Sequence, residues 1–251
     1  MSDEGLLKRR IRMDLQYLGT NYAGWQWQDN ALSIQEVVEN ALEKIVGHHA
    51  RLHASGRTDA GVHAEFQPAH ADVATRLPDY KILNGLNSLL PADVAVLAVS
   101  TTPETWHSRF SAIEKTYRYT IFNRRIRSPF LIGRAWLIHR RLDVEAMRAG
   151  SLALLGEHDF SSFRSAGCSA KHPVRAITEA FIERAGDVVT LRFTSNGFLR
   201  QMVRNMVGTL VDVGKGKMEP GAVNTILEAR NRALAGPCAP AEGLSLIDVR
   251  Y

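Results

Sequence analysis

Residues 55–64 read SGRTDAGVHA and bring a carboxylate, a guanidinium, a hydroxyl and an imidazole into one short segment. The stretches before it, 49–54, and after it, 67–73, are expected to be short strands, so the segment is predicted to be a loop between two sheet elements. Gly56 and Gly61 suit such a loop, because glycine adopts backbone conformations that other residues rarely take and lets a ligand approach closely.

Asp59 and Arg57 allow two interpretations at this point. In the first, they belong to an Asx-type turn in which Asp59 hydrogen-bonds its own backbone and Arg57 is solvated. In the second, the loop displays the carboxylate and the guanidinium to a ligand. The Arg-Thr-Asp tripeptide alone leaves both open, so the choice depends on the remainder of the chain.

Motifs in a fixed order over residues 11–251 resemble the TruA family of tRNA pseudouridine synthases. The ten-residue stretch is similar to that family's GRTDAGVHA signature, in which the aspartate is the catalytic residue. The other matching segments are YLGTNYAGWQ (17–26), NGLNSLLP (84–91), HSRFSA (107–112) with YRY (117–119), GEHDFSSF (156–163), GFLRQMVRN (197–205) and GL (243–244). An ordered series of this length favours the second interpretation.

The resemblance implies an enzyme, a tRNA pseudouridine(38–40) synthase that isomerises uridines 38, 39 and 40 in the anticodon arm of tRNA. By the same resemblance Asp59 is the nucleophile, Tyr117 lies against the target base, and Arg204 pairs with the catalytic aspartate. The family works as a homodimer whose interface forms part of the tRNA cleft, so a homodimer is implied here. Whether Asp59 attacks the sugar or the base stays open.

The implied reaction is an isomerisation by intramolecular transfer, which breaks the glycosidic bond of uridine and rejoins the base through carbon. It needs a nucleophile or an electrostatic partner at the sugar or base, a proton acceptor and a closed site that retains the free uracil, but no metal and no redox cofactor. Asp59 serves as the nucleophile only while it is ionised. Desolvation raises the pKa of a carboxyl group, whereas a nearby guanidinium lowers it by about 1–3 units, which is the role expected of Arg204.

Further residues are candidates for substrate binding. Arg57 suits base flipping, because a planar guanidinium stacks into the gap or holds a phosphate. The Tyr117 ring is expected to stack on the extruded uracil, with its hydroxyl as a candidate proton acceptor, although such an aromatic also suits a core strand. Arg200 is expected one turn from Arg204 on the edge of a helix over 198–213, where both would alternatively be solvated. The candidates for RNA contact or loop support are His63, Arg109 and Lys115.

Two other functions fit parts of the sequence. A non-catalytic RNA-binding module would explain the basic charge and the aromatic residues, but not a carboxylate that faces a polyanion and costs affinity. A zinc nucleoside deaminase would explain His63-Ala64-Glu65 and Pro237-Cys238, but that site needs two cysteines three apart and the chain offers one. We therefore expect no metal site and keep the binding module as the alternative.

Composition bears on the partner and the compartment. The chain has 31 Lys and Arg against 26 Asp and Glu, a net charge of +5 at pH 7, which weakly favours a polyanion such as nucleic acid. Cys168 and Cys238 form no CxxC pair, which fits a reducing cytosol. The first residues carry no signal-peptide pattern, and no apolar run reaches membrane-spanning length. We expect a cytoplasmic protein with no membrane partner.

Apolar periodicity predicts an α+β architecture of tandem ferredoxin-like halves with a mainly antiparallel sheet, which agrees with the pseudouridine synthase fold of the family. The first half, 1–104, carries the Asp59 loop, and the second, 105–251, is expected to complete the active-site cleft. Beside the strands around the loop, strands are predicted at 11–17, 94–99, 115–122, 177–183, 188–193 and 245–251. Helices are predicted after Ser33 up to Gly47 and at 80–90, 144–155, 198–213 and 221–229.

Overall fold

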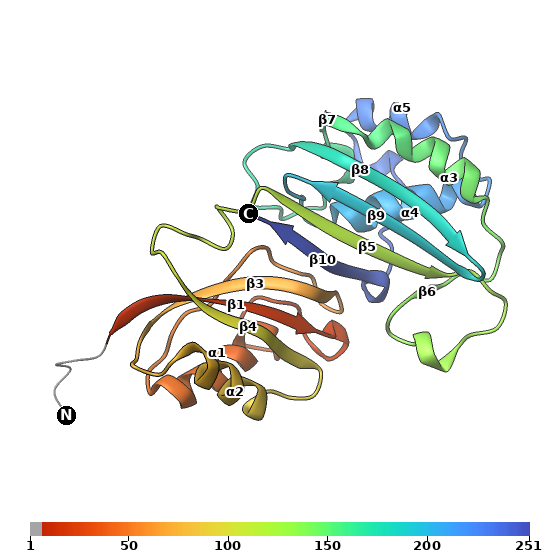
Figure 1. Ribbon diagram of the computed structural model, residues 1–251. Helices are drawn as coiled ribbons and strands as arrows, with labels where there is room; N and C mark the ends of the chain where they lie inside the picture. Colours follow the sequence, from red (N-terminus) through yellow and green to blue (C-terminus); the bar gives the residue numbers. More distant parts are fainter. Residues whose placement is uncertain (1–6) are drawn as a thin grey trace. The chain divides into compact units, whose positions relative to one another are not determined.

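Two units of mixed helix and strand make up the described chain, residues 7–251, in the computed structural model (Figure 1). The first unit extends to Ile113 and also includes Leu246–Tyr251, and the second unit comprises Glu114–Ser245. The sequence placed the boundary after residue 104 instead. The stretch after 104 stays with the first unit because Tyr251 Oη donates to the Ser108 carbonyl at 2.7 Å and Ile113 N donates to the Arg250 carbonyl at 2.8 Å.

The first unit has the predicted strand-helix-strand-strand-helix-strand order. Its strands are antiparallel in the order β4-β1-β3, and the short β2 pairs with β3. Both helices lie on one face of this sheet (Figure 1). The elements are β1 (Lys8–Tyr17), α1 (Ile34–Val46), β2 (His53–Ala54), β3 (His63–Ala74), α2 (Asp79–Leu89) and β4 (Val94–Thr102).

Local sequence explains these elements. In β1, every second residue from Ile11 to Tyr17 is buried, as the alternation predicts for a strand with one core face. Helix α1 begins where the Ser33 hydroxyl accepts from Glu36 N at 3.2 Å, and it ends at Gly47 with φ +80°. The strand expected over 49–54 is reduced to β2, and β3 begins four residues before the expected 67, so the loop proper is residues 55–62.

The second unit contains an antiparallel sheet in the order β5-β9-β8-β7, with β6 parallel to β5. The predicted β8–β9 hairpin is confirmed. The short strands β6 and β7 were not predicted. The elements are β5 (Glu114–Phe122), β6 (Trp136–Leu137), α3 (Val144–Ser151), β7 (Gly156–Asp159), β8 (Val174–Ala185), β9 (Val188–Ser195), α4 (Met202–Gly214) and α5 (Ala222–Ala229). The last strand, β10 (Leu244–Arg250), begins in this unit, and its residues from Leu246 onward belong to the first unit.

Short 3-10 turns complete the described chain. One of them, Leu152–Leu154, replaces the end of the helix expected over 144–155. The turns are Gly19–Asn21, Pro129–Leu131, Leu152–Leu154, Ser161–Phe163, Arg232–Leu234 and Ala241–Gly243. Among the helices of residues 7–251, none is long and apolar enough to cross a bilayer.

Helix α4 corrects one sequence-based boundary. It begins at Met202 rather than near residue 198, because Gln201 takes the left-handed conformation with φ +57°. Arg200 therefore lies in the turn before the helix and not one turn from Arg204 on its edge. Every residue of α4 is buried except Arg204. The helix is thus the core of the second unit, and Arg204 is its one side chain that reaches the surface.

Candidate active site

The loop over residues 55–62 presents its side chains in opposite directions. Thr58 is buried with 6% of its surface exposed, whereas Arg57 is exposed and Asp59 is half-buried. The Tyr17 hydroxyl lies 2.9 Å from Thr58 Oγ1, and burial raises the pKa of Tyr17 to about 12. A neutral hydrogen bond in the core therefore anchors the loop between Arg57 and Asp59.

Gln67 of β3 fixes the start of the same loop. Its Oε1 accepts from Ser55 Oγ at 2.5 Å, and its Nε2 donates to the Gly56 carbonyl at 2.7 Å. Ser55 N donates in turn to the Pro68 carbonyl at 2.8 Å. Ser55 and Gln67 are both fully buried, so each of these bonds satisfies a polar group that water cannot reach.

The segment around Gly24 supports the loop from the other side. Trp25 N donates to the Thr58 carbonyl at 3.0 Å, and Gly61 N donates to the Tyr22 carbonyl at 3.4 Å. Gly24 has φ +97°, and a Cβ there would lie 2.6 Å from the Thr58 carbonyl oxygen and 3.0 Å from the Asp59 carbonyl carbon. Sequence reasoning assigned no role to this glycine. The backbone of Asp59 is therefore positioned by direct contact with Gly24.

We expect Gly24→Ala to lower turnover on the order of 100-fold, because a backbone shift of about 1 Å at a catalytic group has that cost. The matched control is Gly186→Ala, since Gly186 also has positive φ, at +59°, but a Cβ there meets nothing within 4 Å. Both variants carry backbone strain of about 1–3 kcal/mol. Steady-state assays alongside thermal unfolding separate the effects; an equal loss of turnover in both variants would contradict the positioning role.

His63 opens strand β3 and is buried. Its Nδ1 accepts a hydrogen bond from Gly19 N at 2.9 Å, so the neutral ring carries its proton on Nε2. This bond ties the 17–26 motif to the end of the loop. It gives His63 the loop-support role that the sequence proposed, and its contact with substrate stays a prediction.

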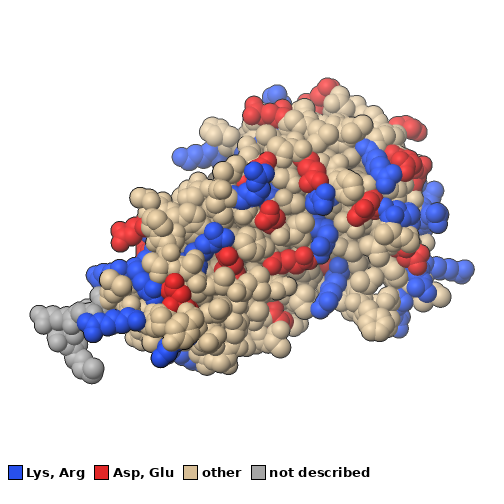
Figure 2. Space-filling view, in the orientation of Figure 1, with Lys and Arg blue, Asp and Glu red and all other residues tan. Residues whose placement is uncertain are grey.

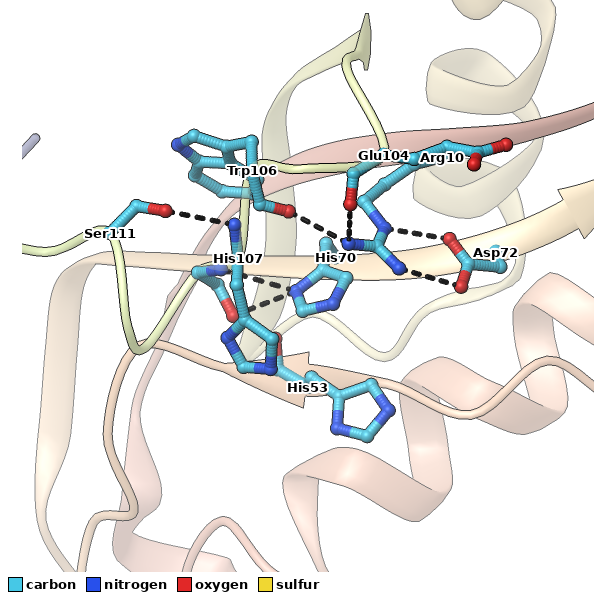
Figure 3. A network of polar contacts seen from close by, with 9 residues as sticks. Arg10, His53, His70, Asp72, Glu104, Trp106, His107 and Ser111 are labelled. Carbon is cyan, nitrogen blue, oxygen red and sulfur yellow. Dashed lines mark hydrogen bonds and ion pairs between the residues drawn. The ribbon is translucent and has the colours of Figure 1, made fainter.

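A cluster of three histidines joins strand β2 to the segment that carries Arg109 (Figure 3). The rings of His53 and His70 stack at 5.0 Å between centroids, and His107 lies 4.5 Å from His70. Ser108 Oγ lies 2.9 Å from His70 Nδ1 and donates to the His53 carbonyl at 2.5 Å. His53 lies in β2, which directly precedes the Asp59 loop in the sequence. The histidine cluster therefore connects the Asp59 loop to the 107–112 motif within the first unit.

Arg10 fastens the same segment to the sheet. Its guanidinium forms two bonds with the Asp72 carboxylate, at 2.7 and 2.8 Å, and donates to the Glu104 carbonyl at 2.5 Å and the Trp106 carbonyl at 2.9 Å (Figure 3). This partner lowers the pKa of Asp72. Arg109, just beyond, is exposed, with its guanidinium 5.7 Å from the Phe110 ring centroid.

The histidine cluster makes stability depend on pH. Burial, with nearby His107, Arg10 and His53, lowers the pKa of His70 to about 4. Above pH 6.5 His70 is neutral in both states, but between pH 6.5 and 4 only the unfolded chain takes up the proton. The free energy of unfolding therefore falls as the pH drops, by on the order of 1 kcal/mol per pH unit for one proton.

Urea unfolding between pH 7.5 and 5 measures this effect. The parent and its histidine variants carry the same carboxylates, so the difference between their pH profiles isolates the histidine contribution. We expect His70→Asn to flatten the dependence and His49→Gln, at an exposed histidine, to leave it unchanged. Identical pH dependence in His70→Asn and the parent would contradict this account.

Tyr117, Tyr119 and Ile121 share one buried face of β5, as the alternation predicted. Tyr117 is 8% exposed, and its ring meets Phe198 edge-to-face at 5.1 Å. The Tyr119 hydroxyl donates to the Pro240 carbonyl at 2.8 Å, and burial raises its pKa. Tyr119 is a core residue, as expected. Lys115, two residues before Tyr117 on the strand, is half-buried.

The segment around Ala239 orients Arg204. Arg204 Nε donates to the Ala239 carbonyl at 2.7 Å, and Ala239 N donates to the Arg204 carbonyl at 3.1 Å. The two backbones approach closely because α4 carries Gly208 here; a Cβ would lie 1.6 Å from the Pro237 carbonyl oxygen. The Ala239 carbonyl thus orients the guanidinium through its Nε. Arg200, in the preceding turn, is exposed and donates to the Ala166 carbonyl at 2.9 Å.

The candidate residues divide between the units. Asp59, Arg57, His63 and Arg109 lie in the first, whereas Lys115, Tyr117, Arg200 and Arg204 lie in the second. Within residues 7–251, no group of three or more His, Cys, Asp and Glu is arranged to hold a metal ion, and both cysteines are free thiols. The candidate residues together offer a carboxylate, a phenol, an imidazole, an amine and guanidinium groups.

Comparison with known proteins identifies the family of the chain. The family model described as tRNA pseudouridine synthase matches residues 15–111 and 151–251. The chain belongs to the tRNA pseudouridine synthase family. As a synthase of this family it is an isomerase that acts on tRNA. Asp59 and Arg204 lie inside the two matched stretches, and Tyr117 lies between them.

Curated relatives of the synthase match over nearly the whole chain. The tRNA pseudouridine synthase A of Beijerinckia indica is 45% identical over 243 residues, which cover 96% of this chain and 94% of that protein. The proteins of the same name from Geobacter sulfurreducens and Myxococcus xanthus are each 46% identical over 243 residues. They cover 97% and 96% of this chain and 100% and 92% of their own lengths.

Proposed function

We propose that this synthase converts uridines 38, 39 and 40 in the anticodon arm of tRNA to pseudouridine, with Asp59 as the nucleophile. The observation that carries the proposal is the construction of the Asp59 loop. Buried bonds from Tyr17 and Gln67 and the backbone contact of Gly24 fix its conformation, while Asp59 itself stays half-buried. A carboxylate positioned this firmly suits attack on a bound nucleotide.

The reaction conserves all the atoms of the uridine. Asp59 forms a covalent bond to the substrate, at the sugar or at the base, and the bond between N1 and C1′ breaks. The uracil turns in the site and C5 bonds to C1′. If Asp59 is bound to the sugar, its ester bond to C1′ breaks as C5 bonds there; if it is bound to the base, the adduct is eliminated after C5 has bonded to C1′. In both routes the proton on C5 leaves to an acceptor and N1 takes up a proton. Because substrate and product are isomers, no co-reactant is consumed.

The remaining residues take supporting roles in this proposal. Arg57 is exposed and makes no side-chain bond to the described residues, so it is available to fill the gap that a flipped base leaves. Tyr117 offers its ring to the extruded uracil. By the family resemblance, Arg204, oriented by Ala239, is the partner of the catalytic carboxylate. His63, Arg109, Lys115 and Arg200 contact the RNA or support the residues that do.

The assembly and compartment form part of the same proposal. A homodimer is supported by the family resemblance, and a cytoplasmic location by the presence of tRNA there and by the two free thiols. Sedimentation of the full chain with and without tRNA tests the first point. A fully active monomer would contradict it.

Three tRNA transcripts, each with uridine at one of positions 38, 39 and 40 and cytidine at the other two, test the specificity. We expect the purified protein to form pseudouridine at that one uridine in each transcript. Modification outside the three positions, or none at all on correctly folded transcripts, would overturn the proposal.

A further inference from the structure

The segment between β5 and α3 carries the whole net positive charge of the chain. Residues 123–141 follow β5 and include β6 and the four residues after it, and we call them the β5–β6 segment. It contains six of the 31 Lys and Arg residues and none of the 26 Asp and Glu residues, so the remainder of the chain has 25 cationic against 26 acidic residues. In Figure 2, blue side chains project from the edge of the second unit where Figure 1 draws this segment. The six residues are Arg124, Arg125, Arg127, Arg134, Arg140 and Arg141.

The topology gathers these arginines at one end of the sheet. Strand β6 pairs parallel to β5, with Ile121 opposite Trp136 and Phe122 opposite Leu137. Both strands therefore leave the sheet in the same direction, and the arginines that follow each strand emerge side by side. His139 Nδ1 lies 2.9 Å from the Arg125 carbonyl oxygen.

A buried asparagine fixes the two ends of the β5–β6 segment. Asn123 is 7% exposed, and its Nδ2 donates to the Ile138 carbonyl at 2.9 Å and the Arg140 carbonyl at 2.7 Å. Its Oδ1 accepts from Leu142 N at 2.9 Å and from Arg184 at 2.8 Å. These four hydrogen bonds use both donor and both acceptor positions of the Asn123 amide, so the ends of the segment are fixed to the second unit.

Most of the guanidinium groups on this segment have no counter-charge. Those of Arg125, Arg127, Arg134 and Arg140 are exposed and make no hydrogen bond or ion pair with any described residue. Arg124 has a distant partner, Asp187 at 3.8 Å. Several arginines elsewhere form close ion pairs, such as Arg10–Asp72 at 2.7 Å and Arg192–Glu179 at 2.6 Å. Neighbouring cations without counter-charges repel one another, and a polyanion relieves this repulsion.

An exposed aromatic ring stands among these charges. Phe130, in the 3-10 turn Pro129–Leu131, is 90% exposed, and Ile126 and Ile132 are 65% and 67% exposed. A protein partner would need to bury three apolar side chains that alternate with unpaired arginines. Single-stranded nucleic acid matches both features, because phosphates pair with arginine and bases stack on an aromatic face.

The position of the segment on β5 separates it from Tyr117. The strand runs on for five residues from Tyr117 to Phe122, which is roughly 17 Å. We propose that the β5–β6 segment is a second RNA-contact surface, which pairs with tRNA phosphates and stacks Phe130 on an unpaired base away from the target nucleotide. The inference rests on the proposed function, because tRNA is its ligand. The segment lies outside the stretches that the family model matches.

The arginine contribution is tested by the salt dependence of tRNA binding. In the full chain we expect Arg125→Gln/Arg127→Gln to weaken binding and to reduce the slope of log Kd against log salt by about 0.7–0.9 for each lost phosphate contact. The control, Lys44→Gln/Lys81→Gln, removes the same charge from exposed positions on α1 and α2 and should leave the slope unchanged. Turnover at saturating tRNA should match the parent in both.

The aromatic contribution is tested at Phe130. We expect Phe130→Ala to raise the Kd for tRNA at least about fivefold, and Phe130→Trp, which retains a stacking face, to keep the affinity of the parent. Because the ring is exposed, neither change should disturb folding, which thermal unfolding checks. A loss of affinity in Phe130→Ala that Phe130→Trp restores would support the stacking contact.

Two outcomes would overturn the inference. One is that the parent makes pseudouridine, but Arg125→Gln/Arg127→Gln keeps the parent's salt slope and both this variant and Phe130→Ala keep its affinity for tRNA. The other is a Phe130→Ala variant that changes the oligomeric state but not tRNA affinity, which would make this a protein-binding surface. A parent that binds tRNA through the segment but makes no pseudouridine would instead overturn the proposed function alone.

Discussion

Asp59→Asn is expected to reduce pseudouridine formation below detection while tRNA affinity stays the same or tightens. The substitution keeps the size of the side chain and most of its hydrogen-bonding reach, but it removes the charge and the nucleophile. Repulsion between the carboxylate and RNA phosphates also disappears. A single-turnover assay with saturating protein measures the chemical step, and filter binding measures the affinity.

The outcome separates an enzyme from a non-catalytic RNA-binding module. A non-catalytic binding module would form no pseudouridine even with Asp59 present, and the carboxylate would only weaken RNA binding. In that case Asp59→Asn would change the affinity alone. Asp29→Asn is the matched control, because Asp29 is exposed on a loop of the same unit and should affect neither quantity. Pseudouridine from verified Asp59→Asn protein at more than a trace of the parent rate would contradict the nucleophile.

Arg204→Ala is expected to approach the same loss of turnover. The family resemblance assigns Arg204 as the partner of the catalytic carboxylate, so its removal should leave that carboxylate without the opposite charge that supports the chemical step. Because both side chains act on one step, Asp59→Asn/Arg204→Ala should lose little more than Asp59→Asn alone. The rates of the three variants, measured in the same single-turnover assay, test this expectation.

Arg204→Lys provides the matched comparison. Lysine keeps the charge but has a single nitrogen, so it cannot both donate to the Ala239 carbonyl as arginine does and pair with a carboxylate in the same way. We expect it to recover only part of the activity. Thermal unfolding reports whether the loss of the Ala239 contact alters the fold. Parent-like turnover in Arg204→Ala would exclude the pairing with Asp59.

Regular elements were predictable where one short pattern determines them. The alternation from Ile11 to Tyr17 defined β1, and Ser33 with Gly47 bounded α1, because capping and burial act within a few residues. Strands β6 and β7 were missed because two and four residues carry too little periodicity. The start of α4 depends on the left-handed Gln201, which propensity does not predict.

The loop that carries Asp59 was predictable from its motif, whereas the contacts between distant backbones were not. The SGRTDAGVHA stretch predicted a loop between two strands, and the role of Asp59 stays a prediction. The contacts of Gly24 with Thr58 and of Gly208 with Pro237 arise only after folding, so neither glycine could be told apart from an ordinary turn or helix glycine. The stacking of His53 on His70 likewise depends on strand pairing between β2 and β3.

Site-resolved pseudouridine mapping on tRNA from cells that lack this protein tests the central claim most directly. Complementation with the parent chain should restore pseudouridine at positions 38, 39 and 40, and complementation with Asp59→Asn at equal abundance should restore none. Pseudouridine at these positions with Asp59→Asn, or their continued absence with the parent chain, would contradict the account.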